Sequence, residues 1–266
     1  MAPVANARFL LRPRWLLSHV LVALLVVTMI NLGFWQLRRL DEKQDRNALI
    51  QARQDEPVVP VEELLGPGAT EGEVDAARYR GVTASGTYDD RATVTVRNRT
   101  QDGAAGAWLV TPLDLGSGER VGVIRGFVGL TADGSAAGAP APEGEVTVSG
   151  QVVAPDRLDG TAPDDLAPLL AEDGVLGGLV LAESSDPPEP NGAEAGGAGG
   201  ADSILVVPPP ELGEGPHLSY AVQWFIFTTI AVIGYPLVLR RVVQRRGKEV
   251  DDDADRRPDE LAHQGG

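Results

Sequence analysis

One imidazole stands out among the side chains that could do chemistry. Between two apolar stretches of the chain, His217 is the only histidine, and it lies three residues before the second stretch. An imidazole can act as a base, bind a metal ion or ligate haem iron. The sequence contains no cysteine, so disulfides, thiolate catalysis and cysteine-ligated metals are excluded.

The other two histidines do not complete a catalytic site with His217. A hydrolytic triad needs a base held beside a nucleophile, but His19 lies inside the first apolar stretch and His263 lies in a polar tail. A metal site built from several histidines is therefore excluded between the stretches, and no pair of carboxylates points to acid–base chemistry. We expect that the protein is not an enzyme.

The neighbours of His217 suggest a flat ligand. At 100° per residue in a helix, His217, Tyr220 and Trp224 share one face, with Ala221 beside them. An imidazole next to an aromatic ring and a small residue suits a planar macrocycle, since histidine commonly holds haem iron. The simpler alternative is an interfacial histidine that only anchors the helix end, and both interpretations are open at this point.

Two uncharged apolar segments must position these residues. Trp15–Trp35 and Tyr220–Leu239 contain no Lys, Arg, Asp or Glu, and each is long enough to cross a hydrocarbon core of about 30 Å. The sequence therefore predicts a membrane protein with two transmembrane helices that bracket a mainly-β (α+β) domain. The expected order is an N-terminal tail (1–14), the first span (15–35), the domain (36–219), the second span (220–239) and a disordered tail (240–266).

The distribution of basic residues predicts the orientation. Arg8, Arg12 and Arg14 precede the first span, and no Lys or Arg lies between Arg157 and Arg240. Directly after the second span come Arg240, Arg241, Arg245, Arg246 and Lys248. Both tails are therefore expected in the cytoplasm and the domain outside it, in the cell inner (plasma) membrane. A cleaved signal peptide is disfavoured, because the first apolar run is longer than a typical signal core.

At the exit of the first span, Gln36, Arg38 and Arg39 are expected at the same membrane level as His217. An arginine there can pair with a haem propionate through two hydrogen bonds. His19 would lie roughly 24 Å away along the helix, too far to be a second axial ligand of the same haem.

The domain reads mainly as strands. Alternating or β-branched segments predict strands at 79–88, 93–98, 107–111, 120–128, 145–153 and 203–207, with 79–98 as a hairpin and the third strand ending at Pro112. Their spacing is typical of a β-meander or a small barrel. Helix is expected over 36–54 and weakly over 161–172. Segments rich in Ala, Gly and Pro predict flexible loops at 131–144 and in an insert at about 184–202.

Charge limits the partners of this domain. Residues 36–219 hold 13 Lys and Arg against 31 Asp and Glu, a net charge of −18. Such an acidic surface will not bind nucleic acid non-specifically. The Gly-rich segment 196–200 lacks the Lys-Ser/Thr ending of a phosphate loop, so nucleotide binding is not expected either.

Five motifs, in order along the chain, resemble the surfeit locus protein 1 (Surf/Shy) family. They are Gly33-Phe-Trp-Gln-Leu-Arg38, Tyr79-Arg80 with Gly86-Thr-Tyr88, Thr111-Pro-Leu113, Arg125-Gly126, and His217-Leu-Ser-Tyr-Ala-Val-Gln-Trp-Phe225. The first and last, each at its own membrane boundary, are the most specific. One departure is Ile124-Arg-Gly-Phe127, where the family usually has Asn-Arg-Gly-Trp.

The resemblance implies a function. Members of the family assist assembly of cytochrome c oxidase, and bacterial members are thought to carry haem a toward its catalytic subunit. By resemblance, His217 matches the histidine proposed to ligate haem iron, with Tyr220, Gln223 and Trp224 beside it. Gln36 and Arg38 match the exit of the first helix. The implied partners are the oxidase catalytic subunit, the haem a synthesis machinery and the lipid bilayer, but no nucleic acid.

We therefore expect an assembly factor that holds haem a transiently and aids its insertion into the oxidase. A first alternative is a scaffold that binds oxidase subunits without haem, with His217 as an anchor. A second alternative, from another class, is a two-span regulator of envelope polysaccharide export.

Overall fold

The computed structural model describes residues 9–131, 134–136, 138–155, 166–190, 192–193 and 203–263. The chain divides into two compact units. One unit, here called the helix pair, contains the described residues up to Asn47 and from Leu212 onward. The other, here called the barrel domain, is Ala48–Glu211.

The helix pair consists of α1 (Pro13–Gln54) as far as Asn47 and the whole of α4 (His217–His263). Both helices are long and apolar enough to cross a membrane, with mean hydropathies of 2.2 and 1.8 in their most apolar windows. Large apolar side chains along them are exposed, for example Leu24 at 58% and Ile230 at 62%, which is the pattern of helices that face lipid. The predicted helix at 36–54 is confirmed as the continuation of α1.

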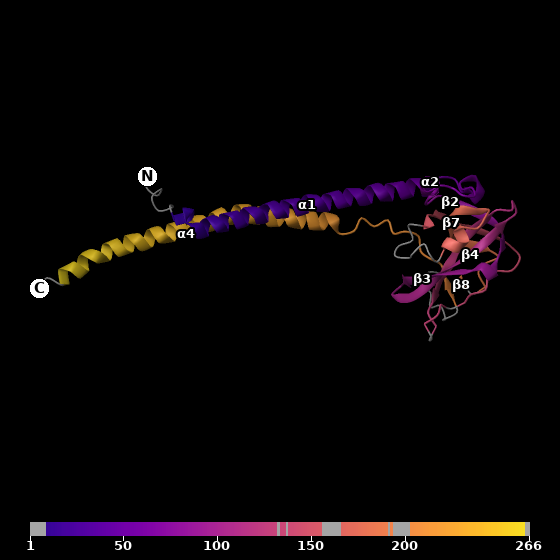
Figure 1. Ribbon diagram of the computed structural model, residues 1–266. Coiled ribbons are helices and arrows are strands. Elements are labelled where there is room, and N and C mark those ends of the chain that lie inside the picture. Colours follow the sequence, from indigo (N-terminus) through magenta and orange to yellow (C-terminus); the bar gives the residue numbers. More distant parts are fainter. Residues whose placement is uncertain are drawn as a thin grey trace. The chain divides into compact units, whose positions relative to one another are not determined.

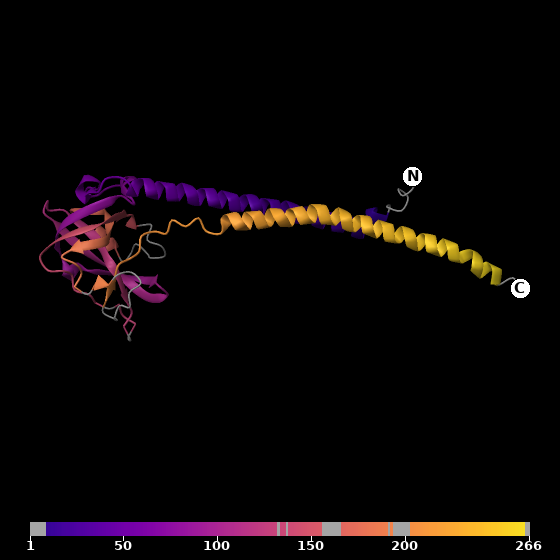
Figure 2. The same ribbon diagram turned by 180° about the vertical axis from the view of Figure 1, so that it is seen from behind.

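The two helices run antiparallel and side by side (Figures 1 and 2). Tyr235 of α4 contacts His19 near the start of α1, whereas the Asn47 side chain donates a 2.7 Å hydrogen bond to the carbonyl of Leu212. Close packing occurs at Gly33, where an added Cβ atom would lie 2.8 Å from the ring of Phe225. A glycine is therefore needed for this approach of the helices.

The barrel domain is a closed five-stranded β-barrel. Its strands are β2 (Gly81–Tyr88), β4 (Ala104–Leu115), β5 (Arg120–Gly129), β6 (Glu145–Val153) and β7 (Val175–Asp186). The pairings β4–β2–β6–β7–β5 return to β4, and only β5–β7 is parallel. Numbered within the barrel, this order is 1-2-3-5-4-1, the topology of the OB fold, whose barrel also has five strands.

Shorter elements extend the barrel. They are β1 (Val59–Pro60), β3 (Val94–Gln101), β8 (Gly192–Ala193), β9 (Ile204–Leu205), η2 (Val61–Glu63), α2 (Glu71–Ala77), η3 (Asp90–Ala92) and α3 (Ala167–Leu170). Helix α2 begins with a capping box, in which Thr70 and Glu73 exchange hydrogen bonds. The backbone N–H of Thr70, followed by its hydroxyl, lowers the pKa of the Glu73 carboxyl.

A contiguous apolar core fills the barrel. Val82, Leu113, Val123, Val148 and Val180 are each fully buried, and they come from all five strands. At roughly 25 cal/mol per Å² of buried apolar area, such side chains supply the main driving force for closure.

The segment that contains η2 and α2 packs on β7 at two adjacent glycines. A Cβ atom at Gly178 would lie 2.6 Å from Leu65, and one at Gly177 would lie 2.7 Å from the carbonyl oxygen of Ala69. Side chains at either position would push this segment off the barrel.

Some strand predictions are wrong in their partners. The predicted hairpin at 79–98 does not form, because β2 pairs with β4 and β6 while β3 pairs with β4. The turn that joins β3 to β4 contains Asp102 and Gly103, both at positive φ, and this local geometry makes the tighter hairpin. The predicted strand ends at Pro112, but β4 continues to Leu115.

Pro112 fits inside β4 because it sits where β4 changes its partner. The register with β3 ends at Val110 and the register with β2 begins at Leu113. The Pro112 carbonyl accepts a 2.9 Å hydrogen bond from the Asp89 N–H on this edge, so the missing proline N–H removes no pairing with β2 or β3.

The predicted loops are more ordered than expected where they are described. Strand β7 was not predicted, and it runs to Asp186, into the segment expected to be a flexible insert from 184. Residue 191 and residues 194–202 of that insert lie outside the described residues, as do 161–165 of the weakly predicted helix. In the 131–144 segment, Ala139 and Ala141 are buried.

Candidate functional site

His217 is the first residue of α4. Gly215, at φ +70°, turns the chain immediately before it. The Pro216 carbonyl then accepts hydrogen bonds from the Tyr220 N–H at 3.1 Å and from the Ser219 hydroxyl at 2.7 Å. These contacts fix the first turn of the helix and hence the backbone position of the imidazole.

Gln36 of α1 holds one ring nitrogen of His217. The Nδ1 atom of His217 lies 2.9 Å from the Oε1 atom of Gln36. An amide oxygen can only accept a hydrogen bond, so Nδ1 carries the proton in this contact. In the neutral ring, Nε2 then has a free lone pair, which is the form of histidine that ligates metals.

Gly215 leaves room at the other edge of the ring. A Cβ atom at Gly215 would lie 3.4 Å from Cδ2 and 3.5 Å from Nε2 of His217. A side chain there would lie in ordinary van der Waals contact with this edge of the ring. The positive φ of Gly215 also favours glycine. Both features fit an imidazole that receives a ligand through Nε2.

Apolar rings surround this end of the helix pair. Phe34 and Phe225 meet edge to face with their centroids 5.5 Å apart. Phe34, Trp35 and Tyr220 are 52%, 44% and 47% exposed. Exposed rings of this kind next to an imidazole offer a surface for a flat apolar ligand or for lipid.

Among the six residues predicted to bind the cofactor, the structure joins His217 and Gln36 by a hydrogen bond. Trp224 packs on Phe227 at 6.1 Å, and Arg39 is exposed, where it pairs with Glu42 at 2.8 Å. Arg38 is also exposed, and it follows Gln36 by two residues, a spacing that does not share a helix face. Tyr220 is exposed on α4.

Sequence reasoning missed a second histidine contact. His19 Nδ1 lies 2.6 Å from the Tyr235 hydroxyl, and the Ser18 hydroxyl lies 2.5 Å from the same oxygen. The signal was present, because a histidine, a serine and a tyrosine within apolar helices need polar partners. The helix pair therefore carries one imidazole contact toward each end of its apolar segment.

The comparison with known protein families concerns most of the chain. The model of the SURF1 family matches residues 23–229. The chain belongs to the SURF1 family. This match includes both helices at their packed region, the whole barrel, and the contact between His217 and Gln36.

Curated relatives agree with this membership. An uncharacterized SURF1-like protein of Mycobacterium bovis is 30% identical over 256 residues, covering 91% of this chain and 89% of the relative. SURF1-like proteins of two Mycobacterium tuberculosis strains match to the same extent. The SURF1 family is a family of assembly factors, linked in general to cytochrome oxidase, and is not a known class of enzymes.

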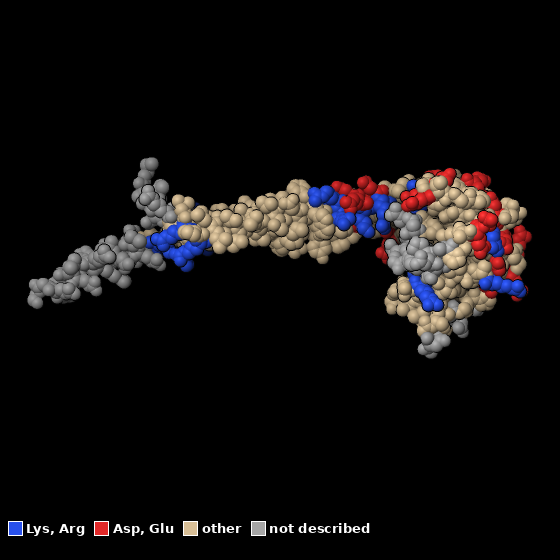
Figure 3. All heavy atoms as spheres, viewed as in Figure 1, with Lys and Arg blue, Asp and Glu red and all other residues tan. Residues whose placement is uncertain are grey.

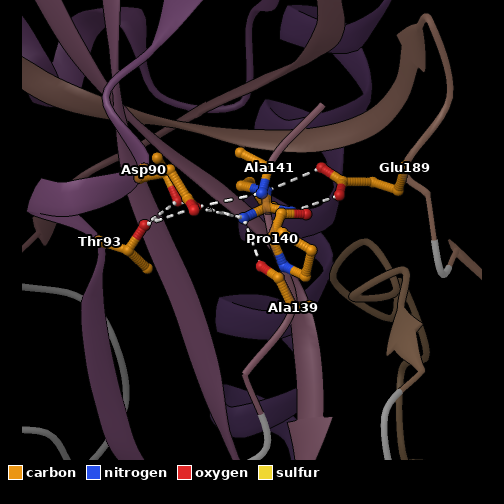
Figure 4. A network of polar contacts seen from close by, with 8 residues as sticks. Asp90, Thr93, Ala139, Pro140, Ala141 and Glu189 are labelled. Carbon is orange, nitrogen blue, oxygen red and sulfur yellow. Dashed lines mark hydrogen bonds and ion pairs between the residues drawn. The ribbon is translucent and has the colours of Figure 1, made fainter. Parts of the chain in front are cut away.

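Within this SURF1-family chain, the most buried charge is in the barrel. The side chain of Arg125 on β5 has no exposed surface, and that of Glu189 is 13% exposed. Two parallel hydrogen bonds of 2.9 and 2.5 Å join the guanidinium to the Glu189 carboxylate. Further donors go to the carbonyls of Ala139 and Pro140 at 3.0 and 2.8 Å (Figure 4).

Arg125 is therefore a structural centre and not a ligand-binding cation. Its last donor points to Thr111, at 3.5 Å. A neighbouring cavity of about 360 Å³ is lined by Arg125, Pro188 and Glu189 among others, but the guanidinium has no donor left to offer to a ligand there.

The Arg125 network affects a nearby phenol. Burial, followed by the charge of Glu189, raises the pKa of Tyr88 well above its usual range. The guanidinium of Arg125 lies 5.5 Å from the ring centroid and opposes this shift. In the described part of the structure, the Tyr88 hydroxyl is buried without a hydrogen-bond partner.

No multidentate metal site is evident. Among the described residues, no group of three or more His, Asp or Glu side chains is arranged to hold a metal ion. The donor set at His217 is a single imidazole nitrogen, which suits an iron that already has four macrocycle ligands.

Proposed function

We propose that this SURF1-family protein is an assembly factor for haem-copper cytochrome c oxidase that holds haem a transiently as cargo at His217. The observation that carries the proposal is the contact between Gln36 and His217, which leaves Nε2 as an open ligand beside Gly215. The partners that receive and supply this cargo would be the oxidase catalytic subunit and the haem a synthesis machinery.

The residues of the helix pair have separate roles in this proposal. Gln36 would hold the proton on Nδ1 and orient the ring, Gly215 forms the turn that places His217 at the start of α4, and His217 would ligate the iron through Nε2. With His217 as the single protein ligand, release of the cargo would require only one bond to the protein to break, which suits transient holding.

The proposal includes a membrane location. The two helices would cross the cell inner membrane with both termini in the cytoplasm, so that His217 and the barrel domain lie at its outer face. The arginines at 12, 14, 240 and 241, with no Lys or Arg between Arg157 and Arg240, support this orientation.

A spectroscopic experiment with a matched control tests the haem proposal. The full chain, purified from a host that makes haem a, should show a haem a spectrum, and His217→Ala should lose it. The control is His19→Ala, which removes the other described imidazole of the helix pair and breaks a contact of similar length. His19→Ala should keep the spectrum.

Each outcome has a clear meaning. A normal haem content in His217→Ala removes His217 from the mechanism. Equal loss in both variants assigns the effect to the packing of the helices instead of to a ligand. If the oxidase co-purifies equally well with wild type and with His217→Ala, and neither contains haem, the scaffold alternative is favoured.

The third reading of the sequence loses its support. Regulators of polysaccharide export of the two-span type are built on long helices between their spans, whereas the domain here is a β-barrel and the chain belongs to the SURF1 family. A deletion strain gives the corresponding test in cells: the haem a band of its membranes should fall.

A further inference from the structure

The two ends of the apolar part of the helix pair differ in charge. One end carries six arginines, here called the arginine collar: Arg12, Arg14, Arg240, Arg241, Arg245 and Arg246. No Asp or Glu occurs in 9–40 or in 215–248. At the other end, Arg38, Arg39, Lys43 and Arg46 are matched by Asp41, Glu42, Asp45 and Glu214. Among the residues that Figure 3 colours by charge, blue occurs without red at the first end and mixed with red at the second.

The collar arginines make no ion pair with any described residue. Five of the six are exposed and Arg246 is half-buried. At the opposite end, by contrast, Arg39 binds Glu42 at 2.8 Å, and Gln44 donates to Glu214 at 3.0 Å. Among the residues whose side chains the structure describes, no carboxylate occupies these guanidinium groups, whose planar donor sets match the geometry of phosphate oxygens.

Aromatic contacts between the two helices hold part of the collar in place. The guanidinium of Arg246 lies 4.3 Å from the ring centroid of Phe9, and Phe9 meets Trp15 edge to face at 5.6 Å. Phe9 is only 8% exposed. The contacts of Tyr235 with Ser18 and His19 join the two helices within two turns of Arg14 and Arg240. Arginines from both helices are thus held at one level.

This level corresponds to lipid headgroups. The collar begins at Arg240, directly after the uncharged stretch that ends at Leu239. The polar layer of a bilayer adds about 5–8 Å on each side of the hydrocarbon core. Arg240 and Arg241 lie at the depth of this layer, and the long side chains of Arg245 and Arg246 can extend back into it. Trp15 and Tyr235 are residue types that mark the same boundary.

Lipid phosphate fits better than a soluble polyanion. An acidic run with Glu249 and Asp251–Asp253 follows the collar in the sequence. At 1.5 Å per residue in α4, it begins roughly 15 Å beyond Leu239, outside the headgroup layer. By their position in the sequence, these acidic residues would repel a nucleic acid that approaches from solution.

We infer that the arginine collar is a binding surface for anionic phospholipid headgroups. Its guanidinium groups donate hydrogen bonds to the lipid phosphates. This inference does not depend on haem binding, because none of the collar residues contacts His217 or Gln36 in the described structure.

The test measures lipid selection by the whole protein. The full chain is reconstituted in nanodiscs with equimolar phosphatidylglycerol and phosphatidylcholine, and the lipid retained on extraction is measured by mass spectrometry. Wild type should retain phosphatidylglycerol preferentially. Replacing Arg240, Arg241, Arg245 and Arg246 by Gln should lower the enrichment by roughly tenfold or more, since each cation near an anionic surface contributes about a fivefold attraction.

A matched variant controls for charge. Replacing Arg38, Arg39, Lys43 and Arg46 by Gln removes the same number of cations at the other end and should leave the enrichment unchanged. Equal loss in both variants, or no enrichment in wild type, overturns the inference. Displacement of the retained lipid by inorganic phosphate would assign the surface to free phosphate instead.

A second measurement needs no variant. The enrichment by wild type should fall as KCl is raised, because exposed guanidinium–phosphate attraction is screened within about 10 Å at 0.1 M salt. An enrichment that does not respond to salt would assign lipid selection to the apolar helices and contradict the role of the collar.

Discussion

Arg125 in the barrel domain and His217 in the helix pair are both polar side chains that join segments far apart in the sequence, but they are used differently. Arg125 directs its donors to Glu189, Ala139, Pro140 and Thr111. His217 gives one nitrogen to Gln36 and keeps the other beside Gly215. A fully satisfied group stabilises a fold, whereas a half-satisfied one can bind a ligand.

The largest effect is expected for Arg125→Leu. The substitution leaves the Glu189 carboxylate buried without its partner and removes a donor from each of two carbonyls, so the free energy of unfolding of the barrel domain should fall by about 3–5 kcal/mol. Denaturant titration of the full chain, followed by the far-ultraviolet signal of the strands, measures this change.

Arg120→Gln is the matched control on the same strand. Arg120 pairs with Asp89, Asp114 and Glu172 at the surface, with its side chain 24% exposed, so its removal should cost about 1 kcal/mol. If both variants lowered the free energy of unfolding equally, burial would not make the Arg125 network more stabilising than the exposed Arg120 pairs.

The next effect concerns the half-satisfied group. Gln36→Leu removes the acceptor that fixes the proton on His217 Nδ1, and haem a affinity should fall ten- to hundredfold, as is usual when a partner of a metal-ligating histidine is lost. Haem titration of the purified protein gives the affinity. Gln244→Leu, at an exposed glutamine of α4 far from His217 in the sequence, should bind haem a as wild type does. If Gln36→Leu also binds normally, the hydrogen bond does not serve the ligand.

Two helix glycines test whether the helix pair depends on close packing at this end. Gly33→Ala places a Cβ atom 2.8 Å from the Phe225 ring, whereas Gly234→Ala meets nothing within 4 Å. Gly33→Ala should destabilise the pair by about 1 kcal/mol through overpacking, and Gly234→Ala should be neutral or stabilising by up to about 1 kcal/mol, as expected for alanine in a helix. Unfolding in mixed micelles compares them; the same sign for both would refute the packing argument.

The last effect is absent at neutral pH and consists of a pH dependence in the barrel. Burial raises the pKa of Tyr88 in the folded state, so the neutral phenol contributes stability that is complete below the unfolded pKa of about 10. Above that pH the unfolded chain loses its proton first, and stability should fall by about 1.4 kcal/mol per pH unit.

Tyr88→Phe should remove this part of the alkaline loss. The free energy of unfolding is measured at intervals from pH 8 to 11 for both proteins. Parallel curves for wild type and variant would show that Tyr88 ionises equally easily in both states.

Much of the helix pair could be predicted from the sequence. The uncharged stretches, the helical continuation over 36–54 and the arginines beside them are local signals, because length and hydrophobicity decide them residue by residue. The strands at 120–128 and 145–153 were recognisable for the same reason, since β-branched residues and alternation mark them.

The barrel's pairing could not be predicted this way. Strand β7 was not predicted, because Gly177 and Gly178 interrupt its apolar run. These glycines are required by a tertiary contact, since Leu65 and Ala69 pack against them. Arg125 in β5 was recognisable only as part of a family motif, and nothing in its neighbourhood in the sequence pointed to Glu189, which lies 64 residues later.

The sequence by itself determined that two apolar helices flank an acidic, strand-rich region, and that one histidine stands at the start of the second helix. Only the tertiary structure decided which groups meet: β5 beside β7 in parallel, Arg125 with Glu189, and His217 with Gln36 across 181 residues. The reason is physical. Secondary structure follows local propensity and periodicity, whereas pairing is chosen by which surfaces and polar groups can be buried together once the chain has closed.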